Sequence, residues 1–210
     1  MGKASVIKAE KFWNRIASHY DKEEKKDEKI YHQIIEKLIP YLKPTDRVLD
    51  FGAGTGLITN EIAKNVRKVC GIDISSKMVE LAMAKAEKRK LNNIQYSHAT
   101  IFDSSLTKGT FDVILASYTL HLVDEPKMVV QRIIELLKPD GMLISVTACM
   151  GEKPIISGFM SIFSRFGFVP KIIPFKLHEL EQLFLDGGLE IVKVEKLADT
   201  SNQYLMIAKK

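Results

Sequence analysis

The spacing of apolar residues changes along this chain of 210 residues. In the N-terminal part, apolar side chains recur every three or four positions, as at Phe12, Ile16 and Tyr20, and again over residues 30–39. This period predicts two amphipathic helices, the first over residues 8–20. Beyond Pro44, short apolar runs bounded by glycine, serine or asparagine alternate with helical segments. That alternation predicts β-α-β units and a parallel sheet.

Five apolar runs have the length and flanking turns of parallel strands. Helices are expected between them over residues 57–66, from an N-cap at Ser75 through Met83, and from Pro126, because proline favours the first helical turn. The motif at residues 138–141 predicts a type I turn before the last parallel strand. The expected strands are residues 47–50, 69–73, 94–98, 111–116 and 142–146.

The C-terminal part has a different pattern. Residues 190–197 and 203–208 are strand-like runs joined by a short polar turn, which predicts an antiparallel hairpin. The expected fold class is therefore α/β, a Rossmann-like doubly wound sheet of five parallel strands plus a C-terminal antiparallel hairpin, with helices on both faces.

A chain of this length can bury one good core but is too short for two ordinary catalytic domains. We expect a single domain over residues 1–210. Its parts are a helical cap (1–43), a cofactor-binding core (44–148), a hydrophobic insertion with a helix (149–188) and the hairpin (189–210).

The insertion is too apolar at residues 154–174 to form an exposed loop. Core packing is the first expectation, and a lid over an acceptor pocket or a dimer interface are the alternatives. The chain is thus expected to be a monomer or a homodimer. The apolar residues concerned are Ile155, Ile156, Phe159, Met160, Ile162, Phe163, Phe166, Phe168, Ile172, Ile173 and Phe175.

Composition adds limits on partners and location. The formal net charge of +5 permits an anionic partner without requiring one, and the charged run at residues 21–29 mixes both signs. The two cysteines are far apart, so neither a disulfide framework nor a metal site is expected. No apolar stretch reaches the ~18 residues of a membrane span, so we expect a cytoplasmic protein.

The strongest chemical signal is the glycine-rich loop after the first strand, with Gly52, Ala53, Gly54 and Gly56. A dinucleotide fingerprint requires glycine or alanine one position beyond the last of these, where this chain has leucine. Asp50, at the strand end, would repel a pyrophosphate but complements the sulfonium and ammonium of S-adenosylmethionine. The loop therefore favours S-adenosylmethionine over a nicotinamide cofactor.

Asp73 ends the second strand, 19 residues after Gly54 (73 − 54). An acid at this position can accept hydrogen bonds from the ribose hydroxyls of either cofactor. Asp73 could instead cap the helix that follows, and the two roles are compatible.

Together these features resemble the class I S-adenosylmethionine-dependent methyltransferases, in the small-molecule branch that includes the ubiquinone and menaquinone biosynthesis enzymes. Residues 12–21 are similar to an N-terminal segment of that branch, with Asn14 in place of the usual acid. Residues 111–114 resemble the family's fourth strand, and residues 137–141 the lead into the fifth. One departure is that the acid after the third strand is delayed to Asp103.

The resemblance implies where the cofactor and the acceptor bind. The end of the fourth strand should form one wall of the acceptor pocket, with Ser117, Tyr118 and His121. His121 is the candidate general base, with packing or a local hydrogen bond as the alternative role. The expected cofactor-binding residues are Tyr20, Asp50, Gly52, Ala53, Gly54, Gly56, Asp73, Ile74, Ile101 and Ala116.

The predicted function is methyl transfer from S-adenosylmethionine to a small hydrophobic or aromatic acceptor. An RNA or protein methyltransferase and a non-catalytic S-adenosylmethionine-binding protein are the alternatives. A nucleic-acid substrate is disfavoured because residues 116–119 read Ala-Ser-Tyr-Thr, which differs from the motif of enzymes that methylate base amines, and no RNA-binding module is visible.

Overall fold

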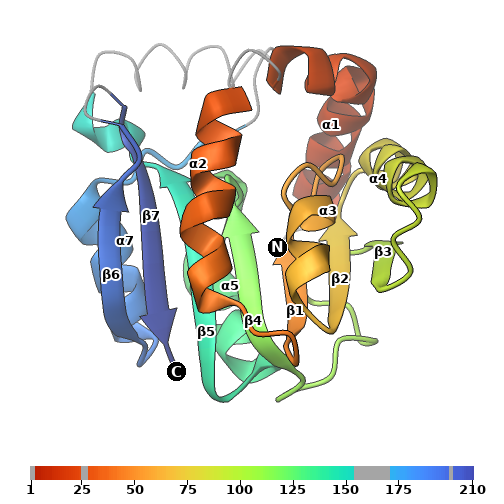
Figure 1. Ribbon diagram of the computed structural model, residues 1–210. Coiled ribbons are helices and arrows are strands. Elements are labelled where there is room, and N and C mark those ends of the chain that lie inside the picture. The colour runs from red at the N-terminus through yellow and green to blue at the C-terminus, as the bar shows by residue number, and fades with distance from the viewer. Residues whose placement is uncertain (1–2, 25–27, 154–170, 199–200) are drawn as a thin grey trace.

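The core of the molecule is one seven-stranded sheet in the order β3-β2-β1-β4-β5-β7-β6 (Figure 1). The computed structural model describes residues 3–24, 28–153, 171–198 and 201–210. β1 to β5 pair in parallel, and β7 is antiparallel to both β5 and β6. This confirms the predicted fold class. The strands are β1 (Arg47–Phe51), β2 (Lys68–Asp73), β3 (Ile94–His98), β4 (Phe111–Ser117), β5 (Leu137–Ala148), β6 (Glu190–Lys196) and β7 (Gln203–Lys209).

Helices cover both faces of this sheet, with α2 and α3 in front and α5 and α7 behind in Figure 1. Short 3₁₀ turns connect several of them: η2 (Ile39–Tyr41), η3 (Ala63–Asn65), η4 (Leu120–Leu122) and η5 (Met150–Glu152). The helices are α1 (Lys3–Glu24), α2 (Glu28–Leu38), α3 (Thr59–Ile62), α4 (Ser76–Lys88), α5 (Pro126–Leu136) and α7 (Leu177–Asp186).

The alternation of side chains along each central strand divides the core into two layers. In β4, Val113 packs in the layer under α2 and α3, whereas Ile114 packs in the layer under α5 and α7. Ile34 of α2 and Ile133 of α5 are fully buried in these two layers. Because both faces are covered, the central strands are apolar at almost every position.

Two predicted helix starts are confirmed. The Ser75 hydroxyl accepts a hydrogen bond from the Met78 amide at 3.1 Å and so caps α4. Pro126 occupies the first turn of α5. Both local signals act within one turn of the chain, so the sequence was sufficient to predict them.

The helix expected over residues 57–66 is shorter than predicted. Only α3 is α-helical, and η3 follows it directly. The side-chain amide of Asn93 donates to the carbonyl oxygens of Ala63 (2.7 Å) and Val66 (3.0 Å). These carbonyl groups are therefore satisfied by the turn before β3, and the helix need not continue to satisfy them.

The prediction of a type I turn at residues 138–141 is wrong in its backbone conformation. Asp140 has φ 62°, the sign that the third residue of a type II turn requires. β5 also begins at Leu137, which pairs with Phe111, while Met142 pairs with Val113. The four residues between therefore bulge opposite a single residue of β4.

Most of the apolar insertion, residues 154–170, lies outside the described residues. At its described end, Phe175 is buried and Ile173 packs against the layer under α5 and α7, as the core interpretation predicts. Across the described ranges, no helix combines the length and apolarity needed to cross a membrane.

Candidate functional site

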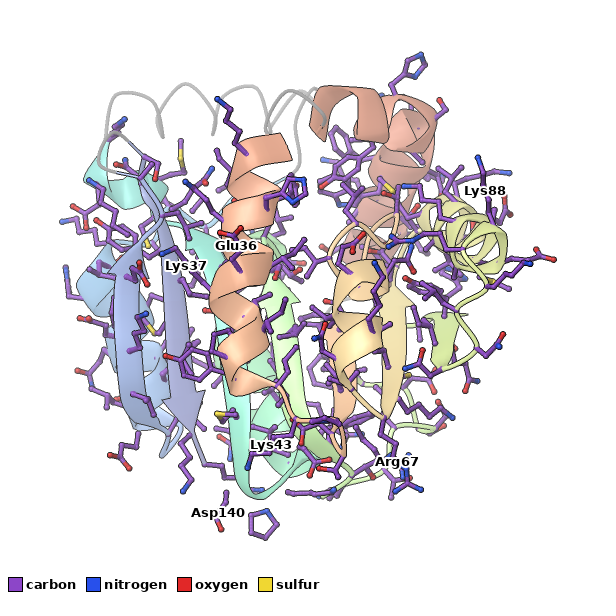
Figure 2. The ribbon with its side chains drawn as sticks, in the orientation of Figure 1. Glu36, Lys37, Lys43, Arg67, Lys88 and Asp140 are labelled. Atoms are coloured by element: carbon purple, nitrogen blue, oxygen red, sulfur yellow. The ribbon has the colours of Figure 1, made fainter. Side chains whose placement is uncertain are left out.

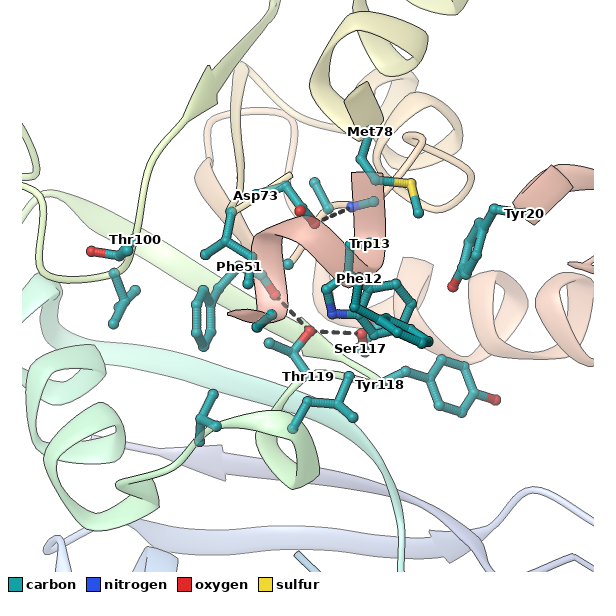
Figure 3. A pocket seen from close by; sticks show the side chains of 18 of the residues that line it. Phe12, Trp13, Tyr20, Phe51, Asp73, Met78, Thr100, Ser117, Tyr118 and Thr119 are labelled. Carbon is teal, nitrogen blue, oxygen red and sulfur yellow. Dashed lines mark hydrogen bonds between the residues drawn. The ribbon is translucent and has the colours of Figure 1, made fainter. Parts of the chain in front are cut away.

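A cavity of about 980 Å³ opens at the carboxyl ends of β1, β2 and β4, where α1 and α2 contribute to its walls (Figure 3). β2 and β3 lie on one side of β1 and β4 lies on the other, so the direction in which successive strands are added reverses at β1. Ligands of open α/β sheets bind at such a switch point. The volume is at the upper end of the range for small-molecule sites, about 300–1,000 Å³.

The loop between β1 and α3 brings backbone to the cavity. Gly52, Gly54 and Gly56 all have positive φ, at 77°, 54° and 78°. A Cβ atom on Gly54 would have only Tyr20 Cε1 near it, at 4.0 Å, because this glycine faces the cavity. A Cβ atom on Gly52 would lie 2.2 Å from Thr119 Oγ1. Glycine is therefore required at Gly52 by packing and at Gly54 by its conformation beside open space.

Asp73 is held at the end of β2 by two backbone donors. The Gly54 amide donates to Oδ2 at 2.9 Å (Figure 3). The Ser75 amide donates to Oδ1 at 2.8 Å. Burial raises the pKa of the Asp73 carboxyl, and these backbone donors oppose that shift. Each carboxylate oxygen keeps acceptor capacity for a further donor, and the residue lines the cavity. The helix-capping role belongs to Ser75.

Asp50, at the end of β1, is more deeply buried than Asp73, with 3% of its surface exposed. Thr59 Oγ1 donates to its Oδ2 at 2.5 Å. Burial raises the pKa of Asp50 from an ordinary 3.8 to about 6; the Thr59 hydrogen bond opposes the shift and the Asp73 charge adds to it. A cationic group in this part of the cavity would stabilise the ionised form of Asp50.

Aromatic side chains from α1, α2 and the end of β4 form much of the remaining cavity wall, and one of them, Tyr20, stands beside Gly54. On α1, the Trp13 ring meets Phe12 edge to face at 5.2 Å and Tyr20 at 6.2 Å between ring centroids. Tyr31 of α2 meets Tyr118 at 6.2 Å. All five line the cavity, and Figure 3 shows four of them beside the ends of the strands. Edge-to-face ring contacts add stability beyond the buried area, so the walls support one another.

Tyr118 has an unusual conformation at the end of β4. Its φ is 54°, which is costly for a bulky side chain. Its amide donates to Val146 O at 2.7 Å, and its hydroxyl donates to Gln203 Oε1 at 2.9 Å. Contacts at both ends of the residue therefore hold the ring in the cavity wall.

Polar contacts attach α1 to the sheet domain. Asn14 Oδ1 accepts from Ser75 Oγ at 2.7 Å and from the Lys77 amide at 3.1 Å. The Ser5 hydroxyl donates to Asp124. Asn14, the residue that departs from the family pattern, thus accepts a hydrogen bond from a free amide at the start of α4.

The structure brings most of the predicted site residues together. Those that line the cavity are Tyr20, Asp50, Gly52, Ala53, Gly54, Asp73, Ile74, Ile101, Ser117 and Tyr118. Gly56, Ala116 and His121 do not line it.

The position of His121 corrects the general-base hypothesis. The residue is 7% exposed, and its Nδ1 has no hydrogen-bond partner among the described residues. Burial lowers the pKa of His121 to about 4. Its carbonyl oxygen accepts from the Ile173 amide at 2.7 Å. An imidazole away from the cavity cannot reach an acceptor there, and the packing role agrees with this position.

Gly56 and Ala116 have packing roles instead of cavity contacts. A Cβ atom on Gly56 would lie 2.5 Å from the Tyr96 hydroxyl, so this glycine is needed where the loop meets β3. Ala116 is fully buried in the layer under α5 and α7. Both positions therefore contribute to packing of the fold and not to the cavity lining.

Several cavity residues were not predicted individually. Phe12 and Trp13 belong to the family-like segment, and the seven-residue interval from Trp13 to Tyr20 indicated a shared helix face. Tyr31 and Thr119 carried no such signal, because their place in the cavity depends on how α2 and the end of β4 pack. Within the described part of the chain, no group of three or more metal-ligating side chains occurs.

Comparison with known proteins agrees with this geometry. A family model described as a methyltransferase domain matches residues 42–167. The ubiquinone biosynthesis O-methyltransferase of Actinobacillus pleuropneumoniae is 31% identical over 148 residues, which are 68% of this chain and 61% of that protein. The demethylmenaquinone methyltransferase of Lactococcus lactis is 25% identical over 221 residues, 93% and 87% of the two chains.

The YcgJ protein of Bacillus subtilis, an uncharacterized methyltransferase, is 25% identical over 150 residues, 71% of this chain and 59% of that protein. Its crystal structure matches with a TM-score of 0.68 at 23% identity, covering 78% and 72% of the two chains. The chain thus spans about three fifths of the length of two of these relatives. The matched family model and the fold agree: this chain belongs to the class I S-adenosylmethionine-dependent methyltransferases, in the branch related to the quinone-biosynthesis enzymes.

Proposed function

We propose that this protein transfers a methyl group from S-adenosylmethionine to a small aromatic or hydrophobic acceptor. One observation carries the proposal: a single cavity has a buried and a half-buried carboxylate with a glycine loop on one side and the rings of Phe12, Trp13, Tyr31 and Tyr118 on the other, with Tyr20 beside the loop. The first side suits a polar cationic cofactor, and the second suits an apolar, planar acceptor.

The residues of the polar side fit the cofactor. Asp73 keeps an acceptor position on each oxygen, which suits the two hydroxyls of a ribose. Gly54 leaves open space where a side chain would stand. Asp50 is a buried carboxylate that a cation would stabilise. Ile74 and Ile101 are apolar residues of the cavity lining, which suits a purine ring.

The chain's own contribution to the reaction is mainly alignment. When bound, the cofactor supplies a methyl group on a sulfonium, and its transfer requires the acceptor atom to lie in line with that group. Trp13, Tyr20 and Tyr118 restrict the orientation of a planar acceptor and keep water from it. Among the described residues, no histidine lines the cavity, and we propose that the acceptor loses its proton without a histidine base.

The relatives support the acceptor class. Two of them are named for ubiquinone and demethylmenaquinone methylation, and the aromatic walls of this cavity suit an acceptor of similar apolar, planar character. The acceptor class rests on the cavity and on these names together.

Calorimetric titration with S-adenosylhomocysteine and, separately, NADH tests the proposal. The parent should bind only the first. Asp73→Asn should weaken that binding on the order of 100-fold, since two hydrogen bonds to a charged group are altered. Asp103→Asn is the matched control, because this half-buried acid follows β3 and does not line the cavity.

Turnover is tested with labelled S-adenosylmethionine and a panel of phenols and quinols. Methyl transfer to one of these compounds would support the proposed methyltransferase activity. Failure to bind S-adenosylhomocysteine, or a preference for NADH, would contradict the proposal. Binding without transfer to phenols, quinols, RNA or protein would instead support the non-catalytic cofactor-binding alternative.

A further inference from the structure

One face of α1 brings basic side chains to the cavity. Lys8, Lys11 and Arg15 follow one another at intervals of three and four residues, which places them on one side of a helix. All three line the cavity. They are also exposed, so they form its rim and not its floor.

Among the described residues, the acids on the cavity wall form no ion pair with the two lysines of this rim. Asp50 and Asp73 lie at the strand ends beside the glycine loop. Asp124 pairs with Lys171 at 3.0 Å and accepts from the Ser5 hydroxyl, so those two charges balance. Glu125 is the other acid of the wall.

The two lysines of the rim have no carboxylate partner among the described residues. Neither Lys8 nor Lys11 forms an ion pair within the described part of the chain, whereas Lys171 does. The basic rim on α1 is therefore positioned to attract an anion that enters the cavity.

The basic rim and the aromatic wall belong to the same helix. The Arg15 guanidinium lies over the Phe12 ring, 5.3 Å from its centroid. Phe12 and Trp13 directly follow Lys11 in the sequence, and both line the cavity. A planar ligand that packs on these rings would hold a substituent on its edge within reach of the basic side chains.

We propose that the methyl acceptor is an aromatic compound with an anionic substituent, which the basic rim of α1 (Lys8, Lys11 and Arg15) receives. This inference rests on the proposed function and narrows its acceptor class. Aromatic walls alone would also suit a cation, but three basic side chains disfavour one.

A pair of matched probes tests the inference. 1-Anilinonaphthalene-8-sulfonate and N-phenyl-1-naphthylamine share a ring system and differ by one sulfonate. Trp13 is the only tryptophan of the chain, so its emission reports occupancy of this cavity. With S-adenosylhomocysteine saturating, the sulfonate should bind about tenfold more tightly, as three exposed charge contacts permit.

The preference should disappear in the triple variant Lys8→Gln, Lys11→Gln, Arg15→Gln, with the affinity for the neutral probe unchanged. The matched control is Lys43→Gln, Arg67→Gln, Lys88→Gln, which removes the same residue types from exposed positions that do not line the cavity. Figure 2 shows Lys43 and Arg67 at the end of the molecule opposite α1. This control should keep the preference.

Equal affinity of the parent for both probes would overturn the inference. So would an equal loss in both triple variants, because the effect would then be one of net charge. If the rim variant lost S-adenosylhomocysteine affinity but kept the probe preference, the rim would serve the cofactor's carboxylate, which also overturns it. A parent that does not bind S-adenosylhomocysteine would instead contradict the proposed function itself.

Discussion

The two sides of the cavity are built in different ways. The side with the glycine loop and Asp73, which we propose binds the cofactor (the cofactor side), joins residues that are close in the sequence. The Gly54 amide and the Asp73 carboxylate are 19 positions apart. The side with the rings of α1 and Tyr118, which we propose binds the acceptor (the acceptor side), depends on hydrogen bonds between residues far apart in the sequence. Asn14 and Ser75 are 61 positions apart, and Tyr118 and Gln203 are 85 positions apart. The cofactor side is a loop within one β-α-β unit. The acceptor side forms only when helices pack against distant strands.

This difference has a functional consequence. A loop shaped by short-range contacts can hold the same cofactor in many proteins of one fold, whereas a wall made by separately attached helices can change with the acceptor. In this chain the glycine loop and Asp73 represent the shared part. Under the proposed function, the aromatic and basic side chains of α1, which line the cavity, would be the part that sets acceptor specificity.

The largest effect is expected on the cofactor side, from Gly52→Ala. The new Cβ atom would lie 2.2 Å from Thr119 Oγ1, at a residue with φ 77°. Steric overlap and the unfavourable backbone together should lower the free energy of unfolding by about 4 kcal/mol. Urea unfolding measures this loss.

Gly109→Ala separates the two causes. Gly109 has φ 62°, but nothing lies within 4 Å of its added Cβ atom, so only the backbone term of about 1–2 kcal/mol should remain. Equal losses in the two variants would show that the Thr119 contact does not constrain the loop.

Asp50→Asn should change how stability depends on pH. Because the folded pKa of Asp50 is raised to about 6, its contribution is present at low pH and is lost as the pH rises from about 4 to 6. Relative to the parent, the variant should therefore gain up to about 3 kcal/mol by pH 7. Urea unfolding at several pH values measures the difference, and a gain independent of pH would contradict it.

His121→Leu is the counterpart with the opposite sign. Burial lowers the pKa of His121 from 6.5 to about 4, so the parent loses stability as the pH falls through this window. The variant, compared with the parent, should gain stability toward low pH, whereas Asp50→Asn gains it toward high pH. Slopes of the same sign would show that one of these two side chains is not buried in its neutral form.

The smallest effect is expected on the acceptor side, from Asn14→Ala. This change removes the acceptor for Ser75 Oγ and the Lys77 amide, which should lower the stability of the attached α1 by about 1 kcal/mol. Thermal unfolding and the emission of Trp13, one residue away, measure it.

Asn14→Asp is the control, because a carboxylate keeps the acceptor oxygen near the N-terminus of α4 and should retain the parent's stability. If Asn14→Ala weakened S-adenosylhomocysteine binding as strongly as Asp73→Asn, the two sides of the cavity would not be separable.

The errors in the sequence-based prediction have one common cause. The helix predicted over residues 57–66 ends early because the side-chain amide of Asn93, 27 to 30 residues away, donates to the carbonyl oxygens of Ala63 and Val66, which follow α3. The sequence places His121 in the cavity because the residue follows β4, but His121 lies in the 3₁₀ turn η4 and is buried there. Both cases depend on contacts between segments that no local pattern of apolar and polar residues describes.

The sequence by itself determined the sheet, the glycine loop, the cap at Ser75 and the position of Asp73, because each follows from periodicity, backbone conformation or hydrogen bonds within one or two turns of chain. Only the tertiary structure decided which aromatic rings face the cofactor side and that the basic side chains of α1 stand at the cavity rim. Those choices depend on how α1 and α2 pack over the ends of the strands. Packing of distant segments is set by the shape and burial of the whole core.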